Sequence, residues 1–259
     1  MENIKRVLSY VRRALDDYNM IEDGDKIAVG VSAGKDSLTL LCAMAEIRRF
    51  YPKKFELIAI TVDMGFDGTD FEPIAKFCRE LDVEYKIVPT QISKIIFDVR
   101  KEKNPCSLCA KMRRGALYGY AKEIGCNKVA LGHHFDDVVE TFMLNLFYEG
   151  RLGCFQPVTY LSNTEITLIR PMLYMPEKDV KYFASKTELP IIKSPCPADG
   201  NTEREEMKKL LASLERENKG LRYRIFGAIQ RGGIDGFKEF GKMQGIKSYA
   251  LEDDVQFEE

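Results

Sequence analysis

Along most of the chain, short apolar runs alternate with longer segments in which apolar residues recur every three or four positions. The short runs predict buried strands at residues 26–31, 55–62, 84–88 and 128–131, with a weaker strand at 167–170. The longer segments predict helices near residues 4–18, 38–50, 71–81, 108–124, 137–148, 177–186 and 203–218. Strands that alternate with helices predict an α/β fold built on a doubly wound parallel sheet.

The same pattern divides the chain into three parts. We expect an N-terminal amphipathic helix in residues 1–22, a central α/β domain that includes the cysteine site in residues 23–200, and a helical C-terminal extension with an acidic tail in residues 201–259. In sheets of this kind, ligands bind beyond the carboxyl ends of the strands. Functional residues are therefore expected in the loops that follow the first, second and fourth strands.

Charge and cysteine content narrow the class of protein. Lys plus Arg number 39 against 40 Asp plus Glu, so a nucleic-acid partner would have to be held by a local basic patch. The chain has no apolar run long enough to span a membrane and no signal-peptide pattern at its start, so a cytoplasmic protein is expected. Seven cysteines in a reducing compartment predict thiols, metal ligands or redox chemistry rather than disulfides.

The most specific stretch, VSAGKDS, follows the first strand. Backbone N–H groups in a tight turn of small residues attract anions, as does the start of the helix that follows, and Lys35 adds a full positive charge. The spacing is not that of the Walker motif, and the alternative is an ordinary strand–turn–helix connection capped by Ser or Asp. The residues expected to hold an oligophosphate are Val31, Ser32, Ala33, Gly34, Lys35, Asp36 and Ser37.

The only two histidines of the chain are adjacent and follow the fourth strand, in the sequence GHHFDD. They are expected at the same edge of the sheet as the phosphate-binding loop. Asp136 and Asp137 open the next helix, and one of them is expected to cap it. A carboxylate at this edge could also coordinate Mg²⁺ or move a proton, and His133 or His134 could contact a phosphate.

Three cysteines form a candidate metal site. Cys106 and Cys109 are separated by two residues at the start of a predicted helix, where both thiols can face one metal. Cys196 stands far along the chain between two prolines, which hold it in a non-helical loop. Three thiolates suit an iron–sulfur cluster with one iron left open, or a zinc ion with a fourth ligand of another type. A reversible dithiol at positions 106 and 109 is the third alternative, and spacing alone does not choose among them.

The densest group of positive charges lies beside the first two of these cysteines. Lys111, Arg113 and Arg114 follow them on the predicted helix, and three further basic residues lie upstream, between positions 100 and 103. Such a patch could draw RNA phosphates to the cysteine site. A solvated helix face is the alternative.

Taken together, these motifs resemble the tRNA 2-thiocytidine synthetase (TtcA-type) family of PP-loop ATP pyrophosphatases. The resemblance runs from the N-terminal helix to about residue 200 and rests on SAGKDS, CSLCAKMRRGALY, KVALGHHFDD, NLFYEG, IRPM and IIKSPC. It implies a Rossmann-like sheet of the adenine nucleotide alpha hydrolase-like type. It also implies that Asp63, which otherwise serves a turn, lies near the adenosine of ATP. The other residues of the implied ATP site are those of positions 31–37, Gly132, His133 and Asp137.

The resemblance implies an ATP-dependent tRNA thiolase that releases AMP and pyrophosphate. Lys35 and Mg²⁺ would neutralise phosphate charge while ATP adenylates the C2 oxygen of a pyrimidine, with cytidine the expected base. A [4Fe-4S] cluster would bind the incoming sulfur on its open iron, with a persulfide on one of the three cysteines as the competing sulfur source. Arg113 would orient the base or the sulfur. Asp136 or Asp137 would hold Mg²⁺ or manage protons. The implied cluster ligands are Cys106, Cys109 and Cys196.

Three positions depart from the family pattern. Ala33 replaces a glycine of the phosphate-binding loop, Phe135 stands where the family often has arginine, and no second cysteine follows Cys196. Only the change at position 135 bears on the substrate, because a missing arginine could alter contacts with phosphate or RNA.

Two other functions remain open. A PP-loop enzyme could adenylate its substrate and use a different nucleophile, as lysidine-forming or amidotransferase relatives do, but the three cysteines then have no task. A nucleotide-binding sensor whose cysteines bind zinc or switch redox state is an alternative of another class. A thiolase would need tRNA and a sulfur donor, for which a cysteine desulfurase is a candidate. The sequence leaves the oligomeric state open, with a homodimer as one alternative.

Overall fold

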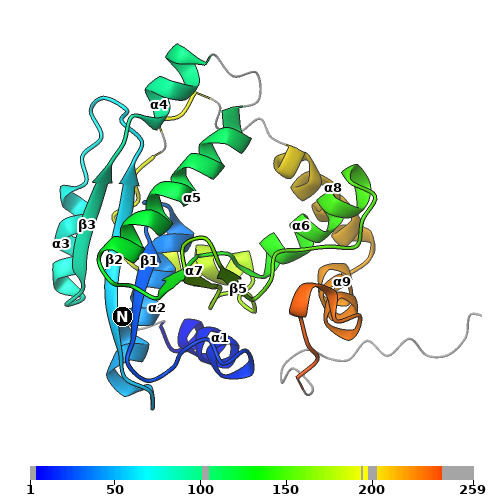
Figure 1. Ribbon diagram of the computed structural model, residues 1–259. Helices are drawn as coiled ribbons and strands as arrows, with labels where there is room; N and C mark the ends of the chain where they lie inside the picture. Colours follow the sequence, from blue (N-terminus) through cyan, green and yellow to red (C-terminus); the bar gives the residue numbers. More distant parts are fainter. Residues whose placement is uncertain (1–3, 101–104, 194, 198–202, 241–259) are drawn as a thin grey trace, which may run out of the picture.

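A six-stranded sheet organises the computed structural model, which describes residues 4–100, 105–193, 195–197 and 203–240 (Figure 1). The strands are β1 (Asp25–Gly30), β2 (Phe55–Asp63), β3 (Glu84–Pro89), β4 (Lys128–Ala130), β5 (Val158–Leu161) and β6 (Ile166–Ile169). Their order across the sheet is β3-β2-β1-β4-β6-β5, and all neighbours are parallel except β5, which runs antiparallel to β6. Because β1 lies between β2 and β4, the loops after these three strands emerge at one edge.

Helices fill the connections between the strands, as the apolar periodicity predicted. They are α1 (Ile4–Asp17), α2 (Lys35–Phe50), α3 (Glu72–Glu80), α4 (Ile92–Lys94), the π-helical turn η1 (Ile95–Val99), α5 (Pro105–Glu123), α6 (Phe135–Tyr148), α7 (Glu177–Lys186), α8 (Glu203–Glu217), α9 (Leu221–Arg231) and the short turn η2 (Ile234–Gly236). Each predicted strand and helix is confirmed, with ends shifted by a few residues. The periodicity missed β5, α4 with η1, and α9.

The two faces of the sheet carry separate hydrophobic cores, as a parallel sheet buried on both sides requires. Along β1, Ile27 and Val29 join the core beneath α1, α2 and α7, whereas Ala28 joins the core beneath α5. Figure 1 shows α5 lying across the sheet, with α6, α8 and α9 grouped on the right of the view. In this group, α6 packs against both α8 and α9. The fold therefore brings the C-terminal helices to the helix that follows β4.

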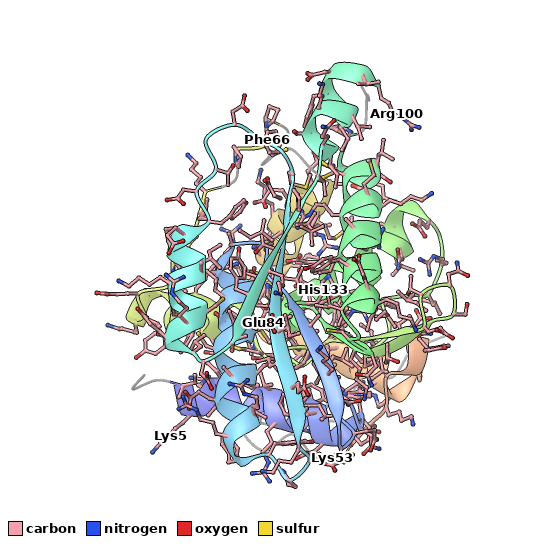
Figure 2. The ribbon with its side chains drawn as sticks, turned by 60° about the vertical axis from the view of Figure 1, so that its left-hand side comes forward. Lys5, Lys53, Phe66, Glu84, Arg100 and His133 are labelled. Atoms are coloured by element: carbon pink, nitrogen blue, oxygen red, sulfur yellow. The ribbon has the colours of Figure 1, made fainter. Side chains whose placement is uncertain are left out.

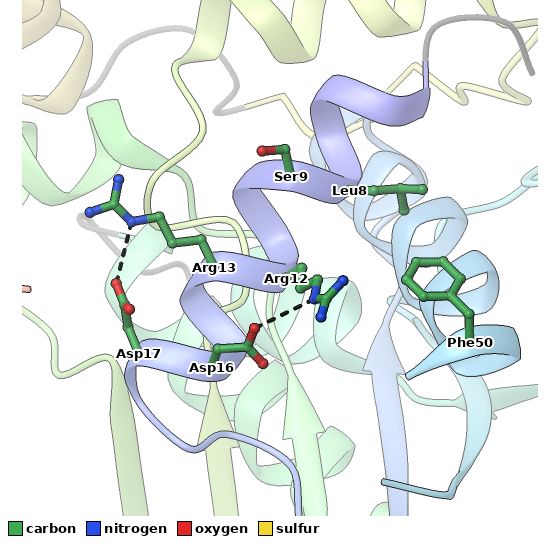
Figure 3. A pocket seen from close by; sticks show the side chains of 7 residues that line it. All are labelled: Leu8, Ser9, Arg12, Arg13, Asp16, Asp17 and Phe50. Atoms are coloured by element: carbon green, nitrogen blue, oxygen red, sulfur yellow. Dashed lines mark hydrogen bonds and ion pairs between the residues drawn. The ribbon is translucent and has the colours of Figure 1, made fainter. Parts of the chain in front are cut away.

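A surface hollow lies along α1, but it is remote from the loops at the strand ends. Figure 3 shows its lining, which includes Arg12, Asp16 and Phe50. Phe50 ends α2, a helix of 16 residues. The hollow thus lies roughly 20 Å from Lys35, at the start of the same helix. This distance excludes it as the place where a phosphate held near Lys35 would react.

The expected division of the chain into three parts stays a prediction. The acidic tail from position 251 lies outside the described residues. Among the helices in the described ranges, none is long and apolar enough to cross a membrane.

Candidate active site

Two loops meet at the carboxyl ends of β1 and β4, which pair as parallel neighbours. Figure 2 shows His133, from the loop after β4, beside the tip of β1. The approach is close, because a Cβ added at Gly132 would lie 3.1 Å from the carbonyl carbon of Asp36 and 3.2 Å from the backbone nitrogen of Ser37. Glycine at this position therefore allows the loop after β4 to touch the start of α2.

The loop after β1 folds into a compact turn that places Lys35 at the start of α2. Ser37 Oγ accepts hydrogen bonds from the N–H (3.1 Å) and the hydroxyl (3.2 Å) of Ser32, and donates to the carbonyl of Gly34 (3.0 Å). Gly34 is the N-cap of α2, and no side chain caps this helix. The turn therefore differs from an ordinary connection in which Ser or Asp caps the helix. The N–H groups of the first helical turn are left able to bind an anion. The helix begins at Lys35, earlier than position 38.

Ala33 adopts the left-handed backbone conformation that favours glycine. Its φ is +64°, and the residue is buried. Glycine would take this φ without a steric penalty, whereas alanine costs about 1 kcal/mol. The departure from the family pattern at this position is thus accommodated as backbone strain.

Lys35 is held between two carboxylates. Its Nζ lies 3.0 Å from Asp36 and 3.3 Å from Glu177, the first residue of α7. Burial opposes ionisation of Glu177, but ion pairs with Lys208, Lys181 and Lys35 outweigh it and lower the pKa of Glu177 to about 2. Glu177 is therefore an anion at neutral pH that keeps Lys35 positioned at the loop.

His134 and Asp137 cap the helix that follows β4. The Asp137 N–H donates to Nδ1 of His134 (3.4 Å), and the His134 N–H donates to Oδ2 of Asp137 (2.9 Å). This reciprocal pair is a capping box, so the expectation that an aspartate caps the helix is met by Asp137. Its other oxygen, Oδ1, lies 3.0 Å from NH1 of Arg204 on α8.

Asp136 is engaged in structural contacts. Its carboxylate accepts the N–H of Glu177 (2.6 Å) and pairs with the guanidinium of Arg222, on α9. These contacts join α6 to α7 and α9, which favours a positioning role for Asp136 and leaves Asp137 the better candidate for chemistry. Phe135 is buried, with its ring centre 4.8 Å from that of Phe226. The position where the family often has arginine is therefore part of the core here.

His133 is neutral in its present surroundings. Burial lowers its pKa to about 4; Asp137 opposes this shift, and Arg170 adds to it. The imidazole packs on Phe155 at 4.8 Å between ring centres, and Arg170 lies over the same Phe155 ring at 4.9 Å. A neutral His133 can donate or accept a hydrogen bond at the site, but it adds no positive charge for a phosphate.

Asp63 ends β2 at the same edge of the sheet and serves a turn. Its Oδ1 accepts the N–H of Gly65 (2.9 Å), and its carbonyl accepts the hydroxyl of Thr90 (2.6 Å). The turn function that the sequence allowed is therefore present. The adenosine contact stays a prediction.

The three candidate cysteine ligands lie near one another, two of them at the start of α5. Burial raises the pKa of the Cys109 thiol, Arg113 lowers it, and the thiols of Cys196 and Cys106 raise it further. Cys109 is thus close enough to each of these groups for their charges to matter. Within the described ranges, no three His, Cys, Asp or Glu side chains are already arranged as a metal site, so shared coordination stays a prediction. The remaining cysteines are buried or half-buried: Cys42, Cys78, Cys126 and Cys154.

A backbone contact ties the segment that carries Cys196 to the phosphate-binding loop. The N–H of Ile192 donates to the carbonyl of Ala33 at 3.1 Å. Cys196 follows four residues later, and four residues span at most about 14 Å. The third candidate ligand is therefore held, through Ile192, within about 14 Å of the loop that carries Lys35.

The basic patch lies on the exposed side of α5. Lys111, Arg113 and Arg114 are all exposed, and Nε of Arg114 donates to the Ala110 carbonyl within the helix (3.1 Å). The patch begins two residues beyond Cys109. Its position is suitable for phosphate contacts beside the cysteines.

Several charged residues at the site were not found from the sequence. Glu177, Arg204 and Lys208 come from α7 and α8, where charges at helix starts and faces give no distinctive signal. Glu140 lies one turn after Asp137 on α6, and burial, with Asp137 next, raises its pKa to about 7. The charges around Lys35 thus depend on helices far along the chain.

Sequence comparison places these features in a known family. The PP-loop domain family matches residues 6–215. This chain belongs to the PP-loop family. The PP-loop protein is similar to the tRNA-cytidine(32) 2-sulfurtransferase of Geobacter sulfurreducens, with 41% identity over 228 residues that cover 87% of this chain and 89% of the relative. It is also 41% identical to that of Teredinibacter turnerae, over 88% of this chain and 76% of the relative. These similarities place it among the PP-loop proteins of the tRNA 2-thiocytidine synthetase type.

Solved structures support the same assignment of the fold. The U34-tRNA thiolase NcsA from Methanococcus maripaludis, solved with its [4Fe-4S] cluster, is 32% identical with a TM-score of 0.73, covering 88% of this PP-loop protein and 78% of NcsA. The NAD+ synthetase of Burkholderia pseudomallei, at 13% identity and a TM-score of 0.50, covers 89% and 88% of the two chains and shares only the fold. The α/β architecture and the PP-loop resemblance predicted from sequence are both confirmed.

Proposed function

We propose that this PP-loop protein is an ATP-dependent tRNA sulfurtransferase, which adenylates the C2 oxygen of a pyrimidine and replaces it with sulfur. Its curated relatives are named tRNA 2-sulfurtransferases, and a similar solved structure is a tRNA thiolase with a [4Fe-4S] cluster. One observation carries the proposal for this chain. The hydrogen bond between Ile192 and Ala33 joins the segment of Cys196 to the phosphate-binding loop.

The phosphate-binding loop supports the adenylation step. A carbonyl oxygen is a poor leaving group, and its adenylation allows it to depart as part of AMP. Lys35 and the N–H groups at the start of α2 would neutralise the charge that develops as pyrophosphate leaves. Mg²⁺ prefers carboxylate oxygens, and Asp36, Asp63 and Asp137 supply them at this edge. Asp137 is the candidate to move a proton or hold the ion.

The cysteines support the sulfur-transfer step. Three thiolates from Cys106, Cys109 and Cys196 fit a [4Fe-4S] cluster, because they leave one of its irons without a protein ligand. When bound, such a cluster supplies an iron that can hold sulfide. Arg113, beside Cys109, favours the thiolate form and would orient the base or the sulfur. The exposed basic patch on α5 would contact tRNA phosphates.

Cytidine is the proposed base. The relatives that are named for cytidine are 41% identical to this chain, whereas the thiolase named for uridine is 32% identical. Uridine is the second candidate, because that thiolase shares the fold with a TM-score of 0.73. A cysteine desulfurase as sulfur donor, a homodimer and a cytoplasmic location are further parts of the proposal.

Nucleoside mass spectrometry of bulk tRNA tests the proposal. A strain that lacks this protein should lose 2-thiocytidine, and loss of 2-thiouridine instead would select the second candidate. Wild-type protein should restore the nucleoside, whereas Lys35→Ala and Cys109→Ser should not. Lys76→Ala, which changes an exposed lysine on α3, is the matched control and should restore it. An unchanged set of thiolated nucleosides in the deletion strain would rule out tRNA thiolation.

A further inference from the structure

Helix α8 brings two positive side chains to the phosphate-binding loop. NH1 of Arg204 lies 3.0 Å from Oδ1 of Asp137, and its NH2 lies 3.2 Å from the Thr141 hydroxyl. Nζ of Lys208 lies 2.9 Å from the carboxylate of Glu177. Residues four positions apart share one face of a helix, so the two cations reach the site from the same side of α8.

These contacts close a ring of polar and charged side chains around the loop. On one side, the carboxylate of Asp137 accepts the backbone N–H of His134, and Nε2 of this histidine lies 3.8 Å from Oδ1 of Asp36. On the other side, Asp36 contacts Lys35 at 3.0 Å, and Lys35 lies 3.3 Å from Glu177. Both ends of this chain of contacts return to α8. The helix therefore completes the surroundings of Lys35.

Asp137 and Glu177 have hydrogen-bond or ion-pair partners besides Arg204 and Lys208. Both carboxylates would therefore keep a partner if the two cations turned toward another anion. Oδ2 of Asp137 accepts the N–H of His134 at 2.9 Å, and Glu177 retains Lys181 at 3.2 Å. The side chains of Arg204 and Lys208 are 45% and 33% exposed, so both are long, partly solvated groups that can turn to a new anion. No buried carboxylate loses its last partner by this exchange.

We propose that Arg204 and Lys208 bind the phosphates of ATP, and that Asp137 and Glu177 hold the two cations in place beforehand. This inference rests on the proposed ATP-dependent function. Lys35 and Lys208 both contact Oε1 of Glu177, so their ammonium groups are close neighbours that can flank one pyrophosphate group. Charge-assisted bonds from arginine and lysine to phosphate are stronger than neutral hydrogen bonds. Helix α8 is then part of the nucleotide site.

Equilibrium binding of inorganic pyrophosphate and of ATP, by titration calorimetry on the full-length protein, tests this role. Arg204→Gln and Lys208→Gln should each raise the Kd for both ligands by about tenfold, the effect of one charge-assisted contact. Lys209→Gln is the matched control, because Lys209 is exposed on the same helix. It should leave both Kd values within about twofold of wild type.

A second pair of variants separates phosphate binding from a purely structural role. Arg204→Lys and Lys208→Arg keep the positive charges and should recover most of the lost affinity, even if all four variants shift the melting temperature. Wild-type Kd values in the folded glutamine variants would overturn the inference while leaving the proposed function intact. If the wild-type protein bound neither pyrophosphate nor ATP, both the inference and the ATP-dependent function would fail.

Discussion

Replacing Gly132 with alanine is expected to disturb the phosphate-binding loop through a single added methyl group. The new Cβ would lie 3.1 Å from the carbonyl carbon of Asp36, 3.2 Å from its oxygen and 3.2 Å from the nitrogen of Ser37. All three atoms are backbone in the first turn of α2, so no side chain can turn away to make room. Either the loop after β4 or the start of α2 has to move, and Lys35 moves with the latter.

The size of the effect follows from this crowding. Forcing an extra methyl group into a packed position typically costs 1–3 kcal/mol, so the free energy of unfolding should fall by about 2 kcal/mol. ATP affinity should fall as well, because the lysine and the N–H groups that we propose bind phosphate would be displaced by a few tenths of an ångström or more. Urea denaturation and calorimetric titration with ATP measure the two quantities.

Gly119→Ala is the matched control. Gly119 lies in α5, and a Cβ added there meets nothing within 4 Å. Alanine in a helix is favoured over glycine by about 1 kcal/mol, so this variant should be more stable than wild type and should bind ATP normally. If Gly132→Ala matched wild type in both stability and ATP affinity, the proposed close contact between the two loops would be wrong.

Three further predictions concern the loop, the neutral histidine and the cysteines. Ala33→Gly should raise the free energy of unfolding by about 0.5–1 kcal/mol in urea melts by relieving the left-handed φ, and a loss of stability would contradict this account. The pKa of His133 is lowered from 6.5 to about 4, so the unfolded chain binds the extra proton, and stability should fall as pH drops from 6.5 to 4. His133→Asn should flatten that slope in pH-dependent melts, and an unchanged slope would refute the assignment. Cys196→Ser should lower the iron and acid-labile sulfide of anaerobically purified protein, whereas Cys154→Ala should not; full iron content in the serine variant would argue against Cys196 as a ligand.

The fold was largely predictable because the apolar spacing within each central strand and helix matches the burial of its residues. The run at β1 is buried on both faces, and the boundaries of α7 follow from its apolar spacing. Strand β5 was missed because it is a four-residue edge strand, antiparallel to its neighbour, with no fully buried residue. Helix α9 was missed because only Phe226 and Ile229 are buried along it, too few to give a clear period.

The residues of the site could be predicted where they are contiguous in the sequence. Where they come from distant segments, no sequence pattern identifies them. The loop after β1 and the histidine loop are local motifs, and strand order brings them together. A pair of aspartates at a helix start does not reveal that Asp136 turns toward Glu177 and Arg222 while Asp137 forms the cap. Likewise, Arg204 reaches Asp137 only because α8 packs on α6, and tertiary packing of this kind leaves no local pattern.

The tether between Ile192 and Ala33 also constrains how the two half-reactions are connected. In the proposed function, adenylation would occur where Lys35 meets the phosphates, and sulfur transfer where the thiols meet the base. Because Cys196 lies within about 14 Å of the tethered residue along the chain, a base activated at the loop need not travel to a second site. An activated base that stays in one place is less exposed to attack by water than one that must be released and bound again. The tether thus favours sulfur transfer close to the phosphate-binding loop.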